Sequence, residues 1–296
     1  MRLIVFLLCL FPAVVAGAQG SALADSIARM LAGFDGRVGV AVVYPGGRVF
    51  EAGAAAHRYP LASVVKFPQA LAILSDEAPY VPLDSAVLVL PEDMQPDTWS
   101  PLRDSFPHGN VRLSLAQLLR YSLQQSDNIA CDVLFSRFAS PVQVEAYVRS
   151  LGLSGFSLSV TEAQMHADPA RSFCNAATPR DVALLFRKFA DGELLPPVAQ
   201  TFVLQTLSGC ATGTDRLPAG LVGTTATVAH KTGTGFRDAA GRLQGFNDAG
   251  FISVPGSGGY SVAVLIDDAR ETDASCAALI ARISACVYRD FLLSEK

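Results

Sequence analysis

Hydrophobic and polar residues follow two different patterns along the chain, one near its ends and another in its middle. Near the N-terminus, residues 37–52 alternate or run apolar on both sides of Pro45-Gly46-Gly47, which predicts a β-hairpin. Three more strand candidates lie near the C-terminus: residues 225–232, 246–254 and 259–267, the last two joined by Pro255-Gly256-Ser257-Gly258. Both ends of the chain are therefore expected to contribute strands.

Helical spacing of apolar residues dominates the remaining sequence. Residues 21–31 predict an amphipathic helix, and from Thr272 onward apolar residues recur at helical spacing to the end. The middle of the chain has five more helix candidates: residues 63–74, 114–123, 128–138, 142–151 and 179–189. Strands at both ends with helices between them predict one sheet built from the two ends and a helical domain inserted into it. A cleft is expected where the two parts meet.

The first residues have the features of an export signal. Met1 and Arg2 give a positive start, an apolar run to Val15 follows, and Ala16-Gly17-Ala18 offers small residues for cleavage. We therefore expect residues 1–18 to be a signal peptide and the protein to be secreted, into the periplasm of a bacterium. A retained membrane anchor is the alternative, but the apolar run is shorter than the roughly 20 residues that a spanning helix needs.

Composition narrows the classes of partner. Half of the residues are apolar and 17% are charged, which predicts a well-filled core rather than a disordered chain. The net charge of −4 and the lack of a basic block argue against nucleic acid and, after signal cleavage, against membrane surfaces. We expect a monomer that acts on a small molecule.

Cysteine and histidine usage gives no sign of a metal or redox centre. The chain contains no Cys-x-x-Cys, and its four histidines lack metal-ligand spacing, so no metal or cofactor is expected. Five cysteines remain after processing: Cys131, Cys174, Cys210, Cys276 and Cys286. At most two disulfides are possible among them, and the sequence leaves their pairing open. Cys276 and Cys286 cannot pair if they share one helix, because about 15 Å of helix axis separates them.

Lysine is rare in this chain, and one lysine follows a serine by three positions. Of only four lysines, Lys66 ends the segment Ser63-Val64-Val65-Lys66 near a predicted helix start. Residues three apart share a helix face, so the amine can reach the hydroxyl. A desolvated lysine can act as a base, and a helix N-terminus stabilises a developing oxyanion. Ser63 is therefore the predicted nucleophile, although an isolated motif of this kind is usually a helix cap beside a solvated lysine.

A second polar motif, Ser126-Asp127-Asn128, lies between two predicted helices. Ser126 could pass a proton to a leaving nitrogen, and the Asn128 amide could bind both a lysine and a substrate carbonyl. Asp127 is expected to fix the loop. Taken alone, the tripeptide is also a common helix N-cap.

The third motif, His230-Lys231-Thr232-Gly233-Thr234-Gly235, is predicted to end an apolar strand. Lys231 offers a positive charge for a substrate carboxylate and Thr232 a hydroxyl, while Gly233 permits close approach to the strand edge. The backbone N–H groups of Thr234 and Ser63 form a predicted oxyanion hole. The alternative is a glycine-rich turn after a strand.

The three motifs together, in this order and spacing, resemble class A serine β-lactamases. The resemblance covers essentially the whole mature chain. It is most specific in three segments that look like the PER-type extended-spectrum branch: Thr98-Trp99-Ser100-Pro101, Thr161 to Asp168 and Val228 to Thr234. It implies a two-domain β-lactamase/transpeptidase-like fold, α/β plus all-α, with an antiparallel five-stranded sheet flanked by helices. The implied α/β domain is 19–57 and 213–296, and the helical domain is 58–212.

The resemblance also assigns roles to residues outside the motifs. Glu162, on an omega loop of about 157–176, matches the glutamate that activates the deacylating water. His166 stands where most of the family has asparagine, Trp99 is expected to wall the cleft opening, and Arg216 to help Lys231 hold the substrate carboxylate. One departure concerns the arginine-aspartate pair that clamps most omega loops. Its aligned positions here are Val160 and Asn175.

The expected reaction is two-step hydrolysis of the β-lactam amide, of the extended-spectrum kind. Ser63 would attack the carbonyl, its proton taken by Lys66 or by Glu162 through a water, and Ser126 would protonate the ring nitrogen. Glu162 would then activate water to release Ser63. The alternatives are a penicillin-binding peptidase, against which Glu162 argues, and a β-lactam sensor domain that stays acylated.

Overall fold

The computed structural model describes residues 15–294, so residues 1–14 of the predicted signal peptide lie outside the described residues. Its α-helices are α1 (Val15–Leu31), α2 (Lys66–Leu74), α3 (Pro101–Ser105), α4 (Leu115–Gln124), α5 (Asn128–Arg137), α6 (Pro141–Ser150), α7 (Glu162–Ala167), α8 (Pro179–Ala190), α9 (Pro197–Ser208) and α10 (Asp273–Ser294). Its 3₁₀ helices are η1 (Pro45–Gly47), η2 (Ala62–Val65), η3 (Pro91–Asp93), η4 (Pro169–Cys174) and η5 (Leu217–Leu221). None of these helices has the length and apolarity required to cross a membrane.

The strands are β1 (Arg37–Val43), β2 (Val49–Gly53), β3 (Tyr59–Pro60), β4 (Ala86–Val89), β5 (Val111–Ser114), β6 (Ala176–Ala177), β7 (Thr227–Arg237), β8 (Leu243–Val254) and β9 (Gly258–Asp267). Five of them form one antiparallel sheet in the order β2-β1-β9-β8-β7. The predicted sheet from both chain ends is thus confirmed. The candidate strand 225–232 was too short at its C-terminal end, since β7 pairs with β8 as far as Arg237 and Leu243.

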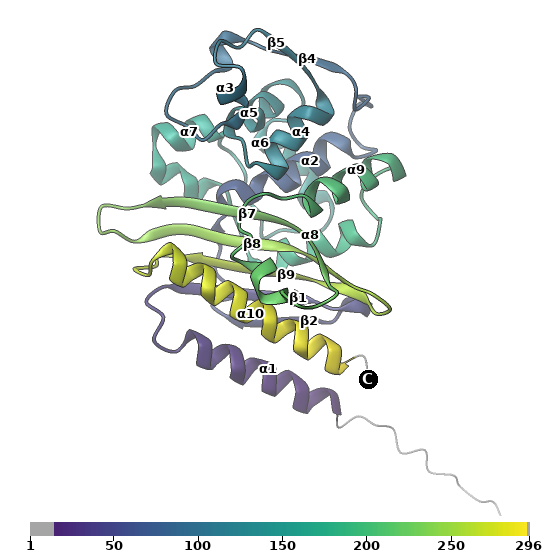
Figure 1. Cartoon of the computed structure of the whole chain (residues 1–296), viewed down its shortest axis with the longest axis vertical. Coiled ribbons are helices and arrows are strands. Elements are labelled where there is room, and N and C mark those ends of the chain that lie inside the picture. The colour runs from purple at the N-terminus through teal and green to yellow at the C-terminus, as the bar shows by residue number, and fades with distance from the viewer. Residues whose placement is uncertain (1–14, 295–296) are drawn as a thin grey trace, which may run out of the picture.

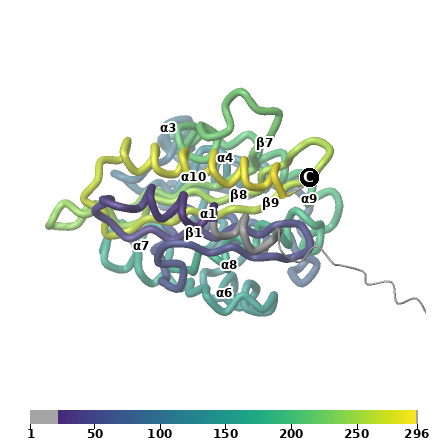
Figure 2. The backbone as a smooth tube through the Cα atoms, turned by 90° about the horizontal axis from the view of Figure 1, so that it is seen from below, coloured from purple at the N-terminus to yellow at the C-terminus, as the bar shows by residue number. Residues whose placement is uncertain are grey.

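The sheet separates two layers of helices (Figure 1). Helices α1 and α10 lie side by side against one face, as Figure 2 shows from below, and α8 packs on the other face beneath the remaining helices. Both faces are buried, because alternate residues of β9 enter different cores. Val262 and Val264 face α1 and α10, whereas Ala263 and Leu265 join the core shared with the middle of the chain.

The predicted helices are all present, with ends within about two residues of the expected positions apart from two. Helix α1 begins earlier, and the helix predicted from residue 63 starts as the 3₁₀ helix η2 and becomes α2 at Lys66. Helix α1 begins at Val15, so the predicted cleavage point after Ala18 lies within it. The sequence patterns missed α3, α7 and α9 and the β4–β5 pair. Helix α9 was not predicted because Val198 and Leu204 face solvent, with 75% and 38% exposure, and so break the amphipathic pattern of the helix. The domain boundaries stay a prediction.

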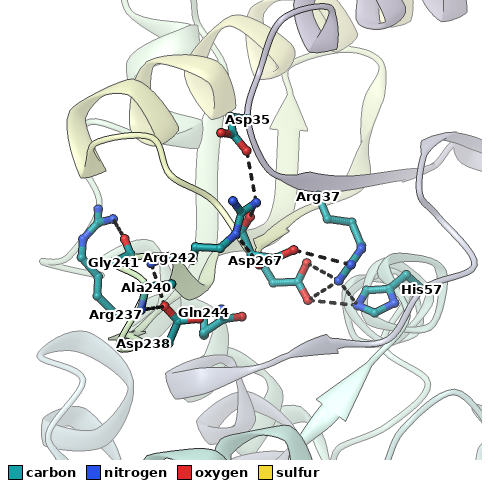
Figure 3. Close-up of polar contacts among 11 residues, drawn as sticks. Asp35, Arg37, His57, Arg237, Asp238, Ala240, Gly241, Arg242, Gln244 and Asp267 are labelled. Atoms are coloured by element: carbon teal, nitrogen blue, oxygen red, sulfur yellow. Dashed lines mark hydrogen bonds and ion pairs between the residues drawn. The ribbon is translucent and has the colours of Figure 1, made fainter.

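A polar cluster closes one end of the sheet (Figure 3). The buried carboxylate of Asp267 accepts hydrogen bonds from Arg37, at 3.2 Å to each oxygen, and lies 2.9 Å from Nε2 of His57. Beside it, Arg242 pairs with Asp35 at 3.1 Å. These opposite charges neutralise one another and tie β1 to β9, so the cluster has a structural role.

Candidate active site

Ser63 lies in η2, which runs directly into α2. Three residues on, Lys66 is fully buried and donates a hydrogen bond to Oγ of Ser63 at 2.7 Å. Ala62 has a left-handed φ of 46°, a conformation that costs about 1 kcal/mol or more for a residue with a Cβ. Pro68 lies in the first turn of α2, where its missing N–H costs no intrahelical hydrogen bond.

Lys66 joins the nucleophile to three other parts of the site. Its Nζ donates to the backbone oxygen of Ser126 at 2.9 Å and to Oδ1 of Asn128 at 2.6 Å. It also lies 3.0 Å from Oε1 of Glu162. That carboxylate oxygen is buried and makes no hydrogen bond within the described residues. Lys66 is therefore placed to exchange a proton with either the serine or the glutamate.

The Ser126-Asp127-Asn128 loop connects α4 to α5 and is held by its aspartate. The buried Asp127 carboxylate accepts hydrogen bonds from the N–H groups of Ala130 and Leu102 at 2.8 and 2.7 Å. Ser126 adopts a left-handed φ of 59°, which this anchoring sustains. The predicted role of Asp127 as the fixer of the loop agrees with these contacts.

Lys231 reaches the same loop from β7. Its Nζ donates to Oγ of Ser126 and to the backbone oxygen of Thr232, both at 2.9 Å. Burial of the ammonium, together with the nearby positive charge of Lys66, lowers the pKa of Lys231 to about 7, although Cys210, Glu162 and Asp248 oppose the shift. A buried lysine at this point can either keep a proton for a bound carboxylate or share one with Ser126.

Gly233 allows β7 to pack tightly against the segment that carries the nucleophile. A Cβ at this position would lie 2.3 Å from the backbone oxygen of Leu61 and 3.3 Å from Cβ of Ala62. Any side chain here would push β7 away from η2 and separate the backbone of Thr234 from that of Ser63. Both of these residues line the same cavity.

Arg216 lies beneath Thr234 and is nearly buried. Its guanidinium donates to Oγ1 of Thr234 at 2.6 Å and to the backbone oxygens of Gly233 and Asn247 at 3.0 and 2.8 Å. Its Cζ stacks 3.7 Å above the ring centroid of Phe246. The positive charge thus lies beside a hydroxyl that faces the cleft.

The motifs meet around a cavity of about 310 Å³. It is lined by Ser63, Trp99, Ser126, Asn128, Thr212, Arg216, Thr232 and Thr234. Trp99 lies at the rim with 62% exposure, and its Nε1 donates to the backbone oxygen of Gln125 at 2.8 Å. Thr212 was not predicted, although its Oγ1 lies 2.5 Å from that of Thr232. His166 is solvent-exposed on α7 and does not line this cavity, so its predicted role stays a prediction.

The omega loop is closed at its base by Asn175 in place of the arginine-aspartate pair. Oδ1 of Asn175 accepts from the N–H groups of Ser159 and Val160 at 2.9 and 3.1 Å, and its Nδ2 donates to the Val160 oxygen at 2.8 Å. The Asn175 backbone oxygen accepts from the N–H of Leu61 at 2.8 Å. One neutral side-chain amide therefore clamps the loop, and the backbone of the same residue ties the loop to the nucleophile segment.

Asp132 positions Glu162 and was missed by the sequence reasoning. Its carboxylate accepts hydrogen bonds from the N–H groups of Glu162 and Ala163 at 2.8 and 2.7 Å, at the start of α7. Burial and the adjacent Glu162 raise the pKa of Asp132 to about 6 against the lowering effect of these N–H groups. The signal was an acidic residue one turn after Asn128 on α5, but nothing local distinguishes it from a solvated acid.

Replacing Asn175 by alanine is expected to destabilise the protein by about 3 kcal/mol, because three backbone groups, two of them on the buried Val160, would lose their partner. Deacylation should slow as Glu162 loses its fixed position. Urea denaturation with far-UV detection measures the stability change. Ser159→Ala is the matched control, since Ser159 contributes only its backbone N–H. Equal stability of the two variants would contradict the clamp.

The fold and the site together define a serine hydrolase that works through an acyl-enzyme. A model of the beta-lactamase enzyme family matches residues 22–291, and the chain belongs to that family. A β-lactamase of Bacteroides uniformis is 36% identical over 93% of each chain. The extended-spectrum β-lactamase PER-1 of Pseudomonas aeruginosa is 30% identical over 92% of this chain and 88% of its own.

A solved class A β-lactamase from Bacteroides cellulosilyticus superposes with a TM-score of 0.87 and 33% identity, covering 94% of this chain and 99% of its own. The predicted class A assignment and the similarity to PER-type enzymes are thus confirmed. The protein is a serine β-lactamase, which hydrolyses the β-lactam amide and so confers resistance to these antibiotics.

Proposed function

We propose that Ser63 is the acylated nucleophile and that Lys66, acting as the neutral amine, takes its proton. The observation that carries this assignment is the position of the Lys66 amine, 2.7 Å from the Ser63 hydroxyl and 3.0 Å from the Glu162 carboxylate. Ser126, 2.9 Å from Nζ of Lys231, delivers a proton to the departing ring nitrogen. The N–H groups of Ser63 and Thr234 hold the oxyanion, a contribution of about 3 kcal/mol per donor.

Deacylation is the task of Glu162. Its buried carboxylate, whose Oε1 lies 3.0 Å from Nζ of Lys66, accepts a proton from water, which then attacks the ester of Ser63. Asp132 and Asn175 hold the loop that carries it. A glutamate this close to Lys66 favours a hydrolase over the penicillin-binding and sensor alternatives, which lack a step that releases the drug quickly.

The substrate carboxylate is bound between Lys231, Thr232 and Thr234, with Arg216 adding charge through Thr234. Asn128 and Trp99 contact the acylamido side of the drug, and His166 on α7, outside the lining of the cavity, is proposed to contact only the part of a long substrate that extends beyond it. The PER-1 relative is named as an extended-spectrum enzyme, which supports oxyimino-cephalosporins as substrates here.

We also propose export through the signal peptide 1–18 to a bacterial periplasm, where the mature chain acts as a monomer without membrane association. The domain boundaries 19–57 with 213–296, and 58–212, complete the proposal. Size-exclusion chromatography of the mature chain tests the oligomeric state.

The experiment that tests the function is turnover of a chromogenic cephalosporin by purified enzyme, with the lifetime of the covalent adduct measured in parallel by mass spectrometry. Rapid turnover with a short-lived adduct on Ser63 supports the proposal. A stable adduct with negligible turnover would instead identify a sensor or a penicillin-binding enzyme.

Lys231 gives the reaction an alkaline limit. Because its pKa is about 7, the free enzyme loses the positive charge as the pH rises through that value. We expect kcat/KM for a carboxylate-bearing cephalosporin to fall at least about tenfold between pH 7 and pH 9. In Lys231→Arg the guanidinium stays charged, and the fall should move beyond this range. Identical pH profiles for the two proteins would contradict the assignment.

A further inference from the structure

A thiol that the proposed reaction does not use lies next to the wall of the substrate cavity. Cys210 follows α9 and is partly exposed, and its Sγ lies 3.4 Å from Oγ1 of Thr212. That hydroxyl lies 2.5 Å from Oγ1 of Thr232. Thr212 and Thr232 both line the cavity, so a single layer of hydroxyls separates the thiol from the site that binds the substrate carboxylate.

Cys210 belongs to a constellation of cysteine, histidine and aspartate. His230 lies two residues before Thr232 on β7, so its side chain is on the same face of the strand as the Thr232 hydroxyl that contacts Thr212, and its Nδ1 lies 2.8 Å from Oδ1 of Asp248. Both His230 and Asp248 are buried, and the second Asp248 oxygen accepts from the N–H of Leu217 at 3.0 Å. A carboxylate that orients an imidazole beside a thiol is the arrangement that activates nucleophilic cysteines.

The charges around the thiol favour the thiolate. Burial alone would raise the pKa of Cys210, but the nearby imidazole and charge of His230 and the charge of Lys231 outweigh it and lower the pKa to about 7. Arg216 adds a further positive charge nearby. Burial would likewise lower the pKa of His230, yet Asp248 and Cys210 raise it to about 10, so the imidazole is cationic at neutral pH.

The other cysteines of the described chain lack this combination of access and charge. Cys131, Cys276 and Cys286 are buried, and burial raises the pKa of Cys131 and that of Cys276, the latter to about 11. Cys174 is exposed on η4 and makes no hydrogen bond with His230 or Lys231 in the described part of the chain.

We propose that Cys210 is a covalent modification site for small uncharged disulfides. The attached group is proposed to narrow the substrate cavity at the wall that binds the substrate carboxylate. The Cys210 thiolate attacks one sulfur of the disulfide, so that a new S–S bond forms to Sγ and the old S–S bond breaks. The second sulfur leaves as a thiolate and takes a proton from solvent. The disulfide supplies the oxidising equivalents, and a reducing thiol reverses the step.

The added group would crowd the contact between Thr212 and Thr232. Because Thr232 follows Lys231 directly and its backbone oxygen accepts from Nζ of that lysine, displacing Thr232 disturbs the positive charge as well. We expect kcat/KM for a cephalosporin to fall at least fivefold on full modification and to recover on reduction. The expected fall in kcat/KM rests on the proposed function, whereas the modification of Cys210 itself does not.

The test treats the Cys174→Ser enzyme with 2-hydroxyethyl disulfide and follows the adduct by intact mass. A thiol with a pKa near 7 is about half ionised at pH 7, against about 3% for an ordinary thiol, but its lower nucleophilicity reduces the advantage to about threefold. The pH at half-maximal rate is therefore the decisive readout. It should lie near 7 in the folded enzyme and at least one pH unit higher in the urea-unfolded chain.

The double variant Cys174→Ser/Cys210→Ser is the matched control and should gain no adduct while keeping its turnover. His230→Asn should move the half-maximal pH upward, and comparison with the unfolded chain tests the same point without altering the buried pair. Equal half-maximal pH in the folded and unfolded chains, or an adduct that appears equally in the double variant, would overturn the modification site. A full Cys210 adduct with unchanged kcat/KM would overturn its effect on the cavity, whatever the outcome for the modification.

Discussion

Glu162→Gln is expected to trap the enzyme as a covalent adduct. Acylation of Ser63 should stay within about tenfold of the native rate, because Lys66 keeps its 2.7 Å hydrogen bond to the serine. Deacylation should slow by about 10² to 10⁴, since an amide cannot accept the proton of the attacking water. Rapid quenching followed by mass spectrometry measures both steps on one sample.

The substitution tests chemistry rather than folding. Glutamine has the shape of glutamate, and the hydrogen bonds that Asp132 accepts at the start of α7 come from backbone N–H groups that the change leaves in place. Glu77→Gln, at an exposed position, is the matched control and should turn over normally. If the Glu162 variant is found free of adduct throughout turnover, this residue does not activate the deacylating water.

Lys66→Ala is expected to abolish acylation, with a loss of at least about 10³ in its rate. The variant removes the base beside Ser63 and also the cation that holds Asn128 and Glu162 in place. Stopped-flow measurement of the first turnover should therefore show no burst. Lys188→Ala is the control, because Lys188 only pairs with Glu193 at the surface, at 3.3 Å.

A normal burst in Lys66→Ala would transfer the role of acylation base to Glu162 acting through water. The two variants therefore form a pair. Loss of acylation only in Lys66→Ala assigns the base to the lysine, and loss in both assigns a shared proton path through the 3.0 Å contact between Lys66 and Glu162.

Local patterns were sufficient for much of the fold and for the motif residues. The apolar alternation of β1, β2, β8 and β9 needs only the period of a strand, and the proximity of Ser63 and Lys66 needs only the pitch of a helix. The strand β7 was cut short because its glycines and threonines are typical of a turn. Its pairing with β8 through Arg237 overrides that preference.

The supporting residues of the site could not be predicted in the same way. Asp132 contacts a backbone 30 residues away, and nothing in its own neighbourhood indicates this. The sequence showed that Asn175 stands where most of the family has one partner of a charged pair, but it did not show how the loop is held instead. The Asn175 clamp depends on three backbone groups that only the folded loop brings within reach of one side-chain amide.

The sequence by itself determined that both chain ends build one sheet. It also predicted the groups proposed to carry the chemistry: a nucleophile with its lysine, a proton-donating serine, a cationic strand and a glutamate. The tertiary structure alone decided how they converge, since Lys231 meets Ser126 across 105 positions of the chain. It also placed Thr212 between Cys210 and Thr232 and left His166 in solvent. The physical reason is that periodicity encodes neighbours within a few residues, whereas contacts between elements depend on how whole buried faces pack.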